Sequence, residues 1–481
     1  MPKTWTIRVL TMSLLLTPAA AFAGRTDWRE MTVGHFHLFS TLRDSSTRDV
    51  ARQLQAFENT VGELLRSEDR LPDVPTLIYI LDRGDFQRYA ADHPGLGGIF
   101  FERPYANVIV INGDMPFDYV RVTIFHEYTH FIQRSSTTKK LPPWYVEGYA
   151  ELFSSFKMDG QKVILGSAPV GVGIDLTQWI PMERLLAVKH TDPEYRAERL
   201  MPQFYGESWA LVHMLLFDDQ TLLRPTSAYL TDLDMGIPEP EAFQRFPFDK
   251  AALDKALRNF LVNRVIHIKS VTFRQEISVD DAPITRMTAA QADTALARLI
   301  FILDRSKDLI DPVVAEARKQ SPDDPGLKAL SARIAAHRGE PIDVGGLVAS
   351  LSTDNADDAQ LRIDVADALL LHAQSDGPAA QALAILDVLA RSENPPIEAV
   401  MLWTGAAGAQ GMDPEQVLPV LVRTAARVPH NTRVLQALAR VSEAAGKKDA
   451  ARSYYDRIIL VSEFPEERLW AQKQADSIRL Q

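Results

Sequence analysis

Hydrophobic and polar residues change their spacing several times over the first 270 residues, which is typical of a fold that mixes strands and helices. Apolar and polar positions alternate from 31 to 39, which predicts a strand, and a helical period from 50 to 65 predicts the helix after it. Continuous apolar runs predict three more strands, at 76–81, 99–101 and 107–111. We therefore expect an α+β arrangement in this part of the chain.

Short strands and separate helices continue to about residue 270. The apolar segments 163–165 and 170–172 predict a short hairpin. Periodicity predicts three further helices, around 179–188, 205–217 and 251–262. Charged residues, threonine and proline mix without a period from 271 to 288, which predicts a linker. The first domain is thus expected at 24–270.

After residue 289 the pattern becomes purely helical. Alanine and leucine dominate, and helical periods recur in units of about 30–40 residues. In the last complete unit, Leu435 and Leu438 mark one helix, Gly446 marks the turn and Tyr455 lies in the next helix. This unit resembles a tetratricopeptide repeat (TPR), and earlier units share the pattern more loosely. Because stacked units bury a common core, we expect 289–481 to form an all-α, TPR-like repeat domain.

The first 23 residues have the pattern of a secretory signal peptide. Lys3 and Arg8 give a positive start, and the apolar stretch 9–20 is too short to span a membrane. Ala21-Phe22-Ala23 fits the small-x-small cleavage pattern, so cleavage is expected after Ala23. No later stretch reaches about 18 apolar residues in a row, so no stable membrane insertion is expected after cleavage. An uncleaved amino-terminal anchor is the alternative interpretation.

Composition narrows the choice of function. The 481 residues are 46% hydrophobic and 24% charged, which is ordinary for a globular protein. The formal net charge is −11 and no long basic tract is present, so we expect no nucleic-acid partner. The sequence contains no cysteine, so a zinc site would have to use histidine and carboxylate ligands. Export without cysteine favours the bacterial periplasm as the location.

The strongest chemical signal is His-Glu-x-x-His at 126–130. Histidines four residues apart project from almost the same helix face, so both imidazoles can reach one metal ion. Glu127 lies about 100° round the helix, where it can act as a general base without being a ligand. Apolar neighbours such as Phe125 and Ile132 indicate a buried helix, in which three polar side chains need a partner. Two core histidines beside a surface glutamate are the alternative interpretation.

A second segment supplies carboxylates at a suitable distance from the histidines. Pro142 and Pro143 suit the start of a helix, and Glu147 follows the second histidine by 147 − 130 = 17 positions, which leaves room for a loop and an antiparallel return. Glu147 and Glu151 share a helix face, so one can bind the metal while the other accepts a hydrogen bond from a ligating imidazole. Gly148 allows the two helices to approach closely. A solvated acidic face is the alternative interpretation.

The first motif, followed by Trp-x-x-Glu-Gly-x-Ala-Glu at 144–151, resembles the gluzincin superfamily of zinc peptidases. The resemblance covers about residues 119–153. It implies a zincin-like α+β metallopeptidase domain in which His126, His130 and Glu147 hold Zn2+. The chain has no Gly-x-Met-Glu-Asn segment, which the aminopeptidases of the superfamily use, so an endopeptidase is favoured over an aminopeptidase.

The resemblance also implies roles for the residues around the ion. Glu127 would take a proton from the attacking water and deliver it to the leaving amine. Glu151 would orient a ligating histidine. The oxyanion needs a further donor, for which Tyr205 is our candidate and His190 the rival. His213 is expected to be a core histidine.

Two further expectations lie outside these motifs. By analogy with zincin folds, the strand at 106–112 is expected to line the cleft and to pair with a peptide substrate at its edge. His35 and His37 face the same side of a predicted strand, and we expect half-buried strand residues there and no metal site.

These observations leave two classes of function. The first is an exported zinc-dependent peptidase that acts on a protein or peptide substrate and docks a protein partner on its helical repeats. The second is a periplasmic repeat scaffold with a vestigial or structural metal site. Glu127 favours the peptidase, because a structural site gains nothing from a carboxylate beside an open metal position. A third possibility is hydrolysis of a non-protein amide, such as a cell-wall peptide bridge, which the sequence does not separate from proteolysis.

Overall fold

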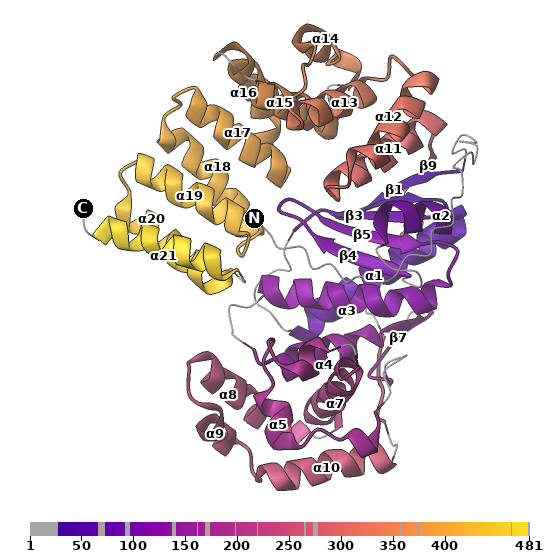
Figure 1. The fold of residues 1–481 in the computed structure, drawn as a ribbon, viewed down its shortest axis with the longest axis vertical. Coiled ribbons are helices and arrows are strands. Elements are labelled where there is room, and N and C mark those ends of the chain that lie inside the picture. The colour runs from indigo at the N-terminus through magenta and orange to yellow at the C-terminus, as the bar shows by residue number, and fades with distance from the viewer. Residues whose placement is uncertain are drawn as a thin grey trace.

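The computed structural model has an α+β fold, with a mixed sheet in the amino-terminal part and a long series of helices in the carboxy-terminal part (Figure 1). The structure describes residues 27–65, 73–91, 97–136, 141–160, 162–168, 174–197, 199–218, 220–263, 266–272, 278–355, 357–372, 376–462 and 464–479. The predicted signal peptide, 1–23, and the predicted strand at 170–172 lie outside these residues. Within them, no helix has the length and apolar character needed to cross a membrane.

The larger sheet has six strands in the order β4-β5-β3-β2-β1-β9. These strands are β1 Arg29–Val33, β2 Phe36–Ser40, β3 Thr76–Leu81, β4 Gly98–Glu102, β5 Asn107–Asn112 and β9 Ile284–Arg286. β2, β3 and β5 run parallel, whereas β1, β4 and β9 pair antiparallel with their neighbours. Because β4 folds back on β5, β5 is enclosed between β4 and β3. The expectation that the strand at 106–112 offers a free edge is therefore wrong, and β4 holds that edge.

The observed strands differ from the elements that the sequence pattern predicts in two segments. The segment 31–39 forms a hairpin of β1 and β2 in place of one strand, because Gly34 adopts φ +56° and the chain reverses there. The segment 271–288, predicted as a linker, includes the end of β8 (Lys269–Thr272) and all of β9, which pairs with β1. Both strands are stabilised by distant partners, which local periodicity does not reveal.

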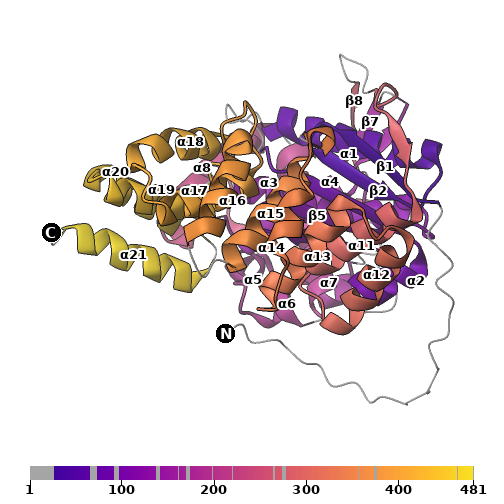
Figure 2. The same ribbon diagram turned by 90° about the horizontal axis from the view of Figure 1, so that it is seen from above.

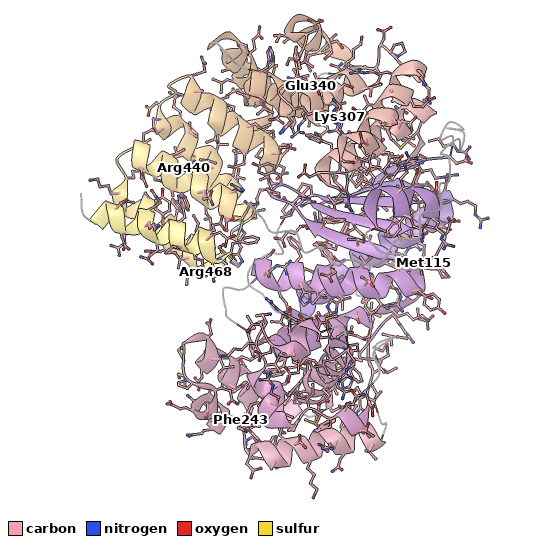
Figure 3. All side chains as sticks on the ribbon, viewed as in Figure 1. Met115, Phe243, Lys307, Glu340, Arg440 and Arg468 are labelled. Carbon is pink, nitrogen blue, oxygen red and sulfur yellow. The ribbon has the colours of Figure 1, made fainter. Side chains whose placement is uncertain are left out.

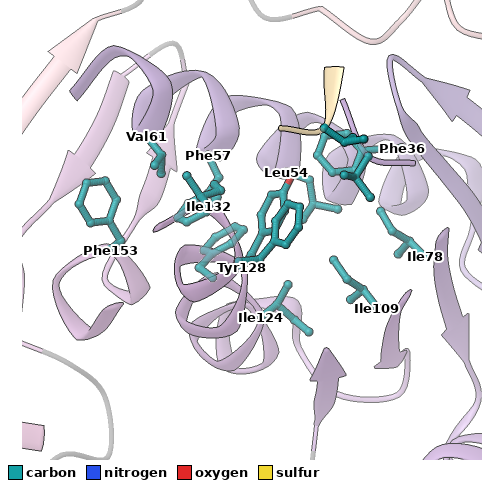
Figure 4. Close-up of a cluster of buried hydrophobic side chains, with 14 of the residues drawn as sticks. Phe36, Leu54, Phe57, Val61, Ile78, Ile109, Ile124, Tyr128, Ile132 and Phe153 are labelled. Atoms are coloured by element: carbon teal, nitrogen blue, oxygen red, sulfur yellow. The ribbon is translucent and has the colours of Figure 1, made fainter. Parts of the chain in front are cut away.

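Helices α1 (Asp44–Leu65) and α3 (Phe117–Ser136) cover one face of this sheet. Their apolar side chains interlock with those of the strands and of α4 (Pro143–Ser154) in one buried cluster (Figure 4). At its centre, Phe57 of α1 stacks on Phe125 of α3, with ring centroids 4.2 Å apart and planes 4° apart. This packing fixes which side of α3 faces the sheet and which side faces away from it.

The helical region begins on the other face of the same sheet. The first helix of this region, α11 (Ala289–Ile302), starts at a capping box formed by Thr288 and Gln291. Its Leu296 and Ile300 are buried in one cluster with Tyr79 of β3 and Val110 of β5. The two regions therefore share a hydrophobic core across the sheet.

A second group of helices packs on the side of α3 that faces away from the sheet (Figure 1). Besides α4 it contains α5 Met182–Ala187, α6 Pro193–Arg196, α7 Met201–His213, α8 Leu223–Asp234, α9 Glu239–Ala242 and α10 Lys250–Asn263. A Cβ atom at Gly148 would overlap the backbone of Ser208, so glycine lets α4 approach α7. The sequence had suggested α3 as the partner at Gly148, because nothing local marks α7 as a neighbour.

The smaller elements complete the amino-terminal part. A three-stranded sheet has the order β6-β7-β8, with β6 at Lys157–Asp159 and β7 at Lys162–Leu165. The predicted strand at 163–165 thus forms its hairpin with the preceding β6. A short helix α2 (Arg83–Asp85) follows β3.

From α11 to α21 successive helices pack on one another and form a curved stack, which we call the helical arc (Figures 1 and 2). After α11 the helices are α12 Lys307–Gln320, α13 Pro325–His337, α14 Val344–Ala349, α15 Ala359–His372, α16 Asp376–Ala390, α17 Ile397–Ala409, α18 Pro414–Arg427, α19 Thr432–Ala444, α20 Lys448–Val461 and α21 Pro465–Arg479. Side chains tie neighbouring turns together: Lys307 and Glu340, both labelled in Figure 3, form an ion pair of 2.9 Å.

A buried ionic network joins three helices of the arc. Arg333 of α13 pairs with Asp364 at 3.0 Å and with Asp367 at 2.7 Å, both on α15, and it also pairs with Glu398 of α17. Buried charges persist only when they are paired and hydrogen-bonded, so this network specifies how the three helices align.

Candidate metal centre

His126 and His130 lie on the side of α3 that faces α4, opposite the apolar side that packs on α1. The helical spacing of four residues brings both rings to one face, and Glu147 of α4 lies against them. The chain after α3 therefore returns, as the 17-residue separation predicted, and brings the carboxylate of Glu147 beside the two histidines.

Three candidate ligand atoms converge on one point. The Nε2 atoms of His126 and His130 are 3.0 Å apart, and Oε2 of Glu147 lies 3.4 Å from each of them. A tetrahedral ion with bonds of about 2.0–2.1 Å holds its ligand atoms about 3.3–3.4 Å apart, so this triangle fits a single ion. Among the described residues, this is the group of three or more His, Asp or Glu side chains that could hold a metal. Two imidazoles and a carboxylate form one of the ligand sets found in catalytic zinc sites.

Burial supports the same interpretation. The side chains of His126, His130 and Glu147 are only 12%, 11% and 3% exposed. Oε2 of Glu147 is buried without a hydrogen-bond partner among the described residues, which is unfavourable unless a cation binds it. Burial alone would raise the pKa of Glu147, but the two histidine rings, whose Nε2 atoms each lie 3.4 Å from Oε2, hold that pKa well below its usual range. Burial opposes protonation of His126, yet Glu147 and Glu151 raise its pKa to about 10.

Glu151 contacts the outer nitrogen of a candidate ligand. Its Oε1 lies 3.3 Å from Nδ1 of His126. A carboxylate at this position holds the proton on Nδ1 and leaves Nε2 free to bind a metal. The structure thus separates the two acids that spacing alone left interchangeable: Glu147 faces the ligand triangle, and Glu151 supports one imidazole.

Tyr205 lies beside the three candidate ligands, the position that the resemblance implies for it. Its ring stacks on His126, with centroids 5.9 Å apart and planes 17° apart. Burial, together with the charges of Glu147 and Glu127, raises the pKa of the Tyr205 phenol above its usual range. The phenol therefore remains protonated at neutral pH and is available as a hydrogen-bond donor. Glu127 is half-buried on the same side of α3.

Tyr195, on the short helix α6, is a site residue that sequence reasoning missed. Its hydroxyl donates a hydrogen bond of 2.6 Å to Oε1 of Glu147, the oxygen outside the ligand triangle. Its ring lies 6.3 Å from that of Tyr205, and burial with the charge of Glu147 raises its pKa as well. No motif marks this tyrosine; the one local signal is Asp192-Pro193, which begins the helix that carries it.

The other histidines that the sequence analysis named lie outside the ligand triangle. His190 is exposed, and its ring lies 4.7 Å from that of Tyr195, at the edge of the site. His213 is fully buried and hydrogen-bonded to Asp218 at 3.1 Å, which confirms the prediction of a core histidine. His35 and His37 are half-buried, as predicted, but His35 lies in the turn between β1 and β2, and His37 is the one that lies on a strand.

Tyr128 anchors α3 from the opposite side. Its hydroxyl donates a hydrogen bond of 3.2 Å to Oε1 of Glu58 on α1, and Nε2 of His35 lies 3.3 Å from the same hydroxyl. Burial raises the pKa of Glu58 to about 7. This polar contact within an apolar cluster fixes the rotation of α3, and therefore the direction in which its two metal-motif histidines point.

Comparisons with protein-family models, with curated proteins and with solved structures give no match for this chain. The assignment of a function therefore depends on the geometry of the site.

Proposed function

We propose that the chain is a zinc-dependent peptidase, with a zincin-like domain of the gluzincin type and a TPR-like helical arc. The observation that carries the proposal is the convergence of His126, His130 and Glu147 on one point, with Glu127 on the next helix position. A purely structural site closes its coordination with a fourth protein ligand, whereas the described residues offer three ligands here and a neighbouring base.

The residues of the site would divide the chemistry among them. The two histidines and Glu147 would hold a divalent ion, which would supply Lewis acidity to a peptide carbonyl and to water. Glu127 accepts the proton of the attacking water and delivers it to the leaving amine. The protonated phenol of Tyr205 donates a hydrogen bond to the developing oxyanion. Tyr195 restrains Oε1 of Glu147, so that Oε2 stays directed at the ligand triangle.

A peptide substrate suits the edge of the larger sheet. β4 is the terminal strand and packs next to α3, and an extended peptide can add to such an edge through main-chain hydrogen bonds. The edge of β4 thus takes the place of β5 (the strand expected at 106–112) as the strand with which a peptide substrate would pair. Endopeptidase activity, export to the bacterial periplasm and a protein partner for the helical arc remain part of the proposal.

The proposal is tested by cleavage of a broad library of unstructured peptides, analysed by mass spectrometry. The zinc-loaded full chain is expected to cleave internal peptide bonds, to lose this activity with a chelator and to regain it with added zinc. Zinc-loaded protein that cleaves no member of the library would contradict the peptidase proposal and leave the scaffold interpretation.

The two tyrosines are expected to fail in different ways when changed to phenylalanine. Tyr205→Phe should lower kcat by about 10²–10³-fold with little change in bound zinc, because it removes a donor to the oxyanion. Tyr195→Phe should weaken zinc binding by about 10–100-fold, because it releases the Glu147 carboxylate. Steady-state kinetics and competition with a chromogenic chelator separate the two effects, and each variant is the control for the other. Equal effects of both changes on zinc binding would contradict the assignment.

A further inference from the structure

Two of the contacts between the helical arc and the sheet region lie far apart along the arc. At its start, α11 packs on the sheet. Far along the chain, the segment Arg427–Asn431, which joins α18 to α19, returns to the end of α3 and to the turn between β4 and β5 (Figure 1). We call this segment the α18–α19 corner.

The first contact of the corner is an ion pair. Nη2 of Arg427 lies 2.7 Å from Oδ2 of Asp73, and the Nε of the same guanidinium donates to this oxygen at 2.8 Å. The backbone N–H of Asp73 also donates to the carbonyl of Arg427 at 3.3 Å. Asp73 directly precedes the segment that enters β3, so the contact joins α18 to the start of a central strand. Arg427 is itself oriented by a hydrogen bond of 2.7 Å to the carbonyl of Pro395.

The second and third contacts are hydrogen bonds to backbone carbonyls. Nδ1 of His430 donates to the carbonyl of Arg134 at 2.8 Å, and Nδ2 of Asn431 donates to the carbonyl of Pro104 at 2.7 Å. Arg134 lies in the last turn of α3, one turn after His130. His430 therefore caps the helix that carries both candidate histidine ligands.

The turn between β4 and β5 also enters the inner side of the arc. Tyr105 in this turn is half-buried, and its pKa is raised by burial and by the charge of Glu398 on α17. Repeat proteins commonly bind partners on this concave side. At this place the surface is occupied by the chain itself.

We propose that the α18–α19 corner is a latch, in which Arg427, His430 and Asn431 are positioning residues for the end of α3 and for the β4–β5 turn. The helical arc then holds the end of α3, the helix that carries both candidate histidine ligands, in addition to any role in binding a partner. This inference deepens the proposed function, because the site that the latch positions is the proposed zinc site.

The test uses variants of the full chain that open the latch without disturbing the arc. Asn431→Asp removes the donor to Pro104 but keeps the oxygen that caps α19 through the N–H groups of Arg433 and Val434. His430→Phe keeps a ring and removes the donor to α3. Arg423→Gln is the control: Arg423 lies one turn before Arg427 on α18, and the hydrogen bond that it makes among the described residues stays within the arc, to the carbonyl of Ala390.

Two measurements are made on each variant: hydrogen exchange of the backbone amides in the last turn of α3, and zinc affinity by competition with a chelator. In the double variant His430→Phe/Asn431→Asp we expect exchange there to quicken by about ten-fold or more, and zinc binding to weaken by a similar factor, with no such change in Arg423→Gln. Exchange at α3 equal to that of the control, or quickened evenly over the whole chain, would overturn the latch. The exchange measurement needs neither zinc nor peptide cleavage, so its outcome is independent of the proposed function.

Discussion

Replacement of Glu127 by glutamine is expected to leave zinc bound while it reduces peptide hydrolysis by about 10²–10⁴-fold, the contribution of a positioned general base. Glutamine keeps the size and polarity of the side chain but cannot accept the proton of the attacking water. Because Glu127 is outside the ligand triangle, its loss removes no metal contact. The measurement is zinc content per chain together with kcat/KM on the best peptide of the library.

The control for this prediction is Asp118→Asn, a comparable neutralisation in the first turn of the same helix, where the side chain pairs with Arg121. It is expected to cleave at nearly the rate of the unaltered chain. Equal cleavage rates for Glu127→Gln and the unaltered chain would show that another group takes the proton, and would refute the role of Glu127.

Replacement of Glu147 by alanine is expected to lower zinc affinity by at least about a hundred-fold. A structural zinc site gains about 10–16 kcal/mol from four ligands, or about 3 kcal/mol for each, which corresponds to a factor of this size. The matched control is Glu151→Gln, four residues further on α4, which touches the outer nitrogen of His126. This control is expected to lose only about 10–100-fold, as is usual for a residue that supports a ligand.

Elemental analysis after extensive dialysis, followed by chelator competition, distinguishes the two α4 variants. Unchanged zinc stoichiometry and affinity in Glu147→Ala would refute its role as a ligand. A larger loss in Glu151→Gln than in Glu147→Ala would reverse the roles of the two acids.

Local sequence was sufficient to predict which residues share a helix face and where the purely helical region begins. The spacing of His126 and His130 places two imidazoles on one face of α3. The spacing of Glu147 and Glu151 likewise places two carboxylates on one face of α4. The change to a purely helical period at 289 coincides with the first residue of α11. These features depend on periods of 3.6 residues and on helix caps, which are encoded within a few positions.

Contacts between distant segments were not predictable in this way. Tyr195 reaches Glu147 from 48 positions away, and Gly148 packs against α7, which lies about 60 positions further along the chain. The short strand β9 pairs with β1 across some 250 residues, so its sequence resembled a linker. Each of these contacts is determined by tertiary packing, and a single sequence has no local signal for it.

The turn at Gly34 is an intermediate case. Alternation continues through 31–39, so periodicity alone predicts one strand, but the chain reverses at the one residue in this segment that adopts a positive φ. A glycine between two alternating segments is a known signal for a hairpin. Greater weight on Gly34 would have separated β1 from β2.

The most direct test of the account is X-ray absorption spectroscopy at the zinc edge on the full chain loaded with one equivalent of zinc. We expect one zinc ion per chain, with two imidazole nitrogens and carboxylate or water oxygens at about 2.0–2.2 Å. The imidazole signal should disappear in a variant in which both His126 and His130 are changed to alanine. Zinc bound without imidazole ligands, or with an unchanged spectrum in that variant, would contradict the metal centre on which the proposed function depends.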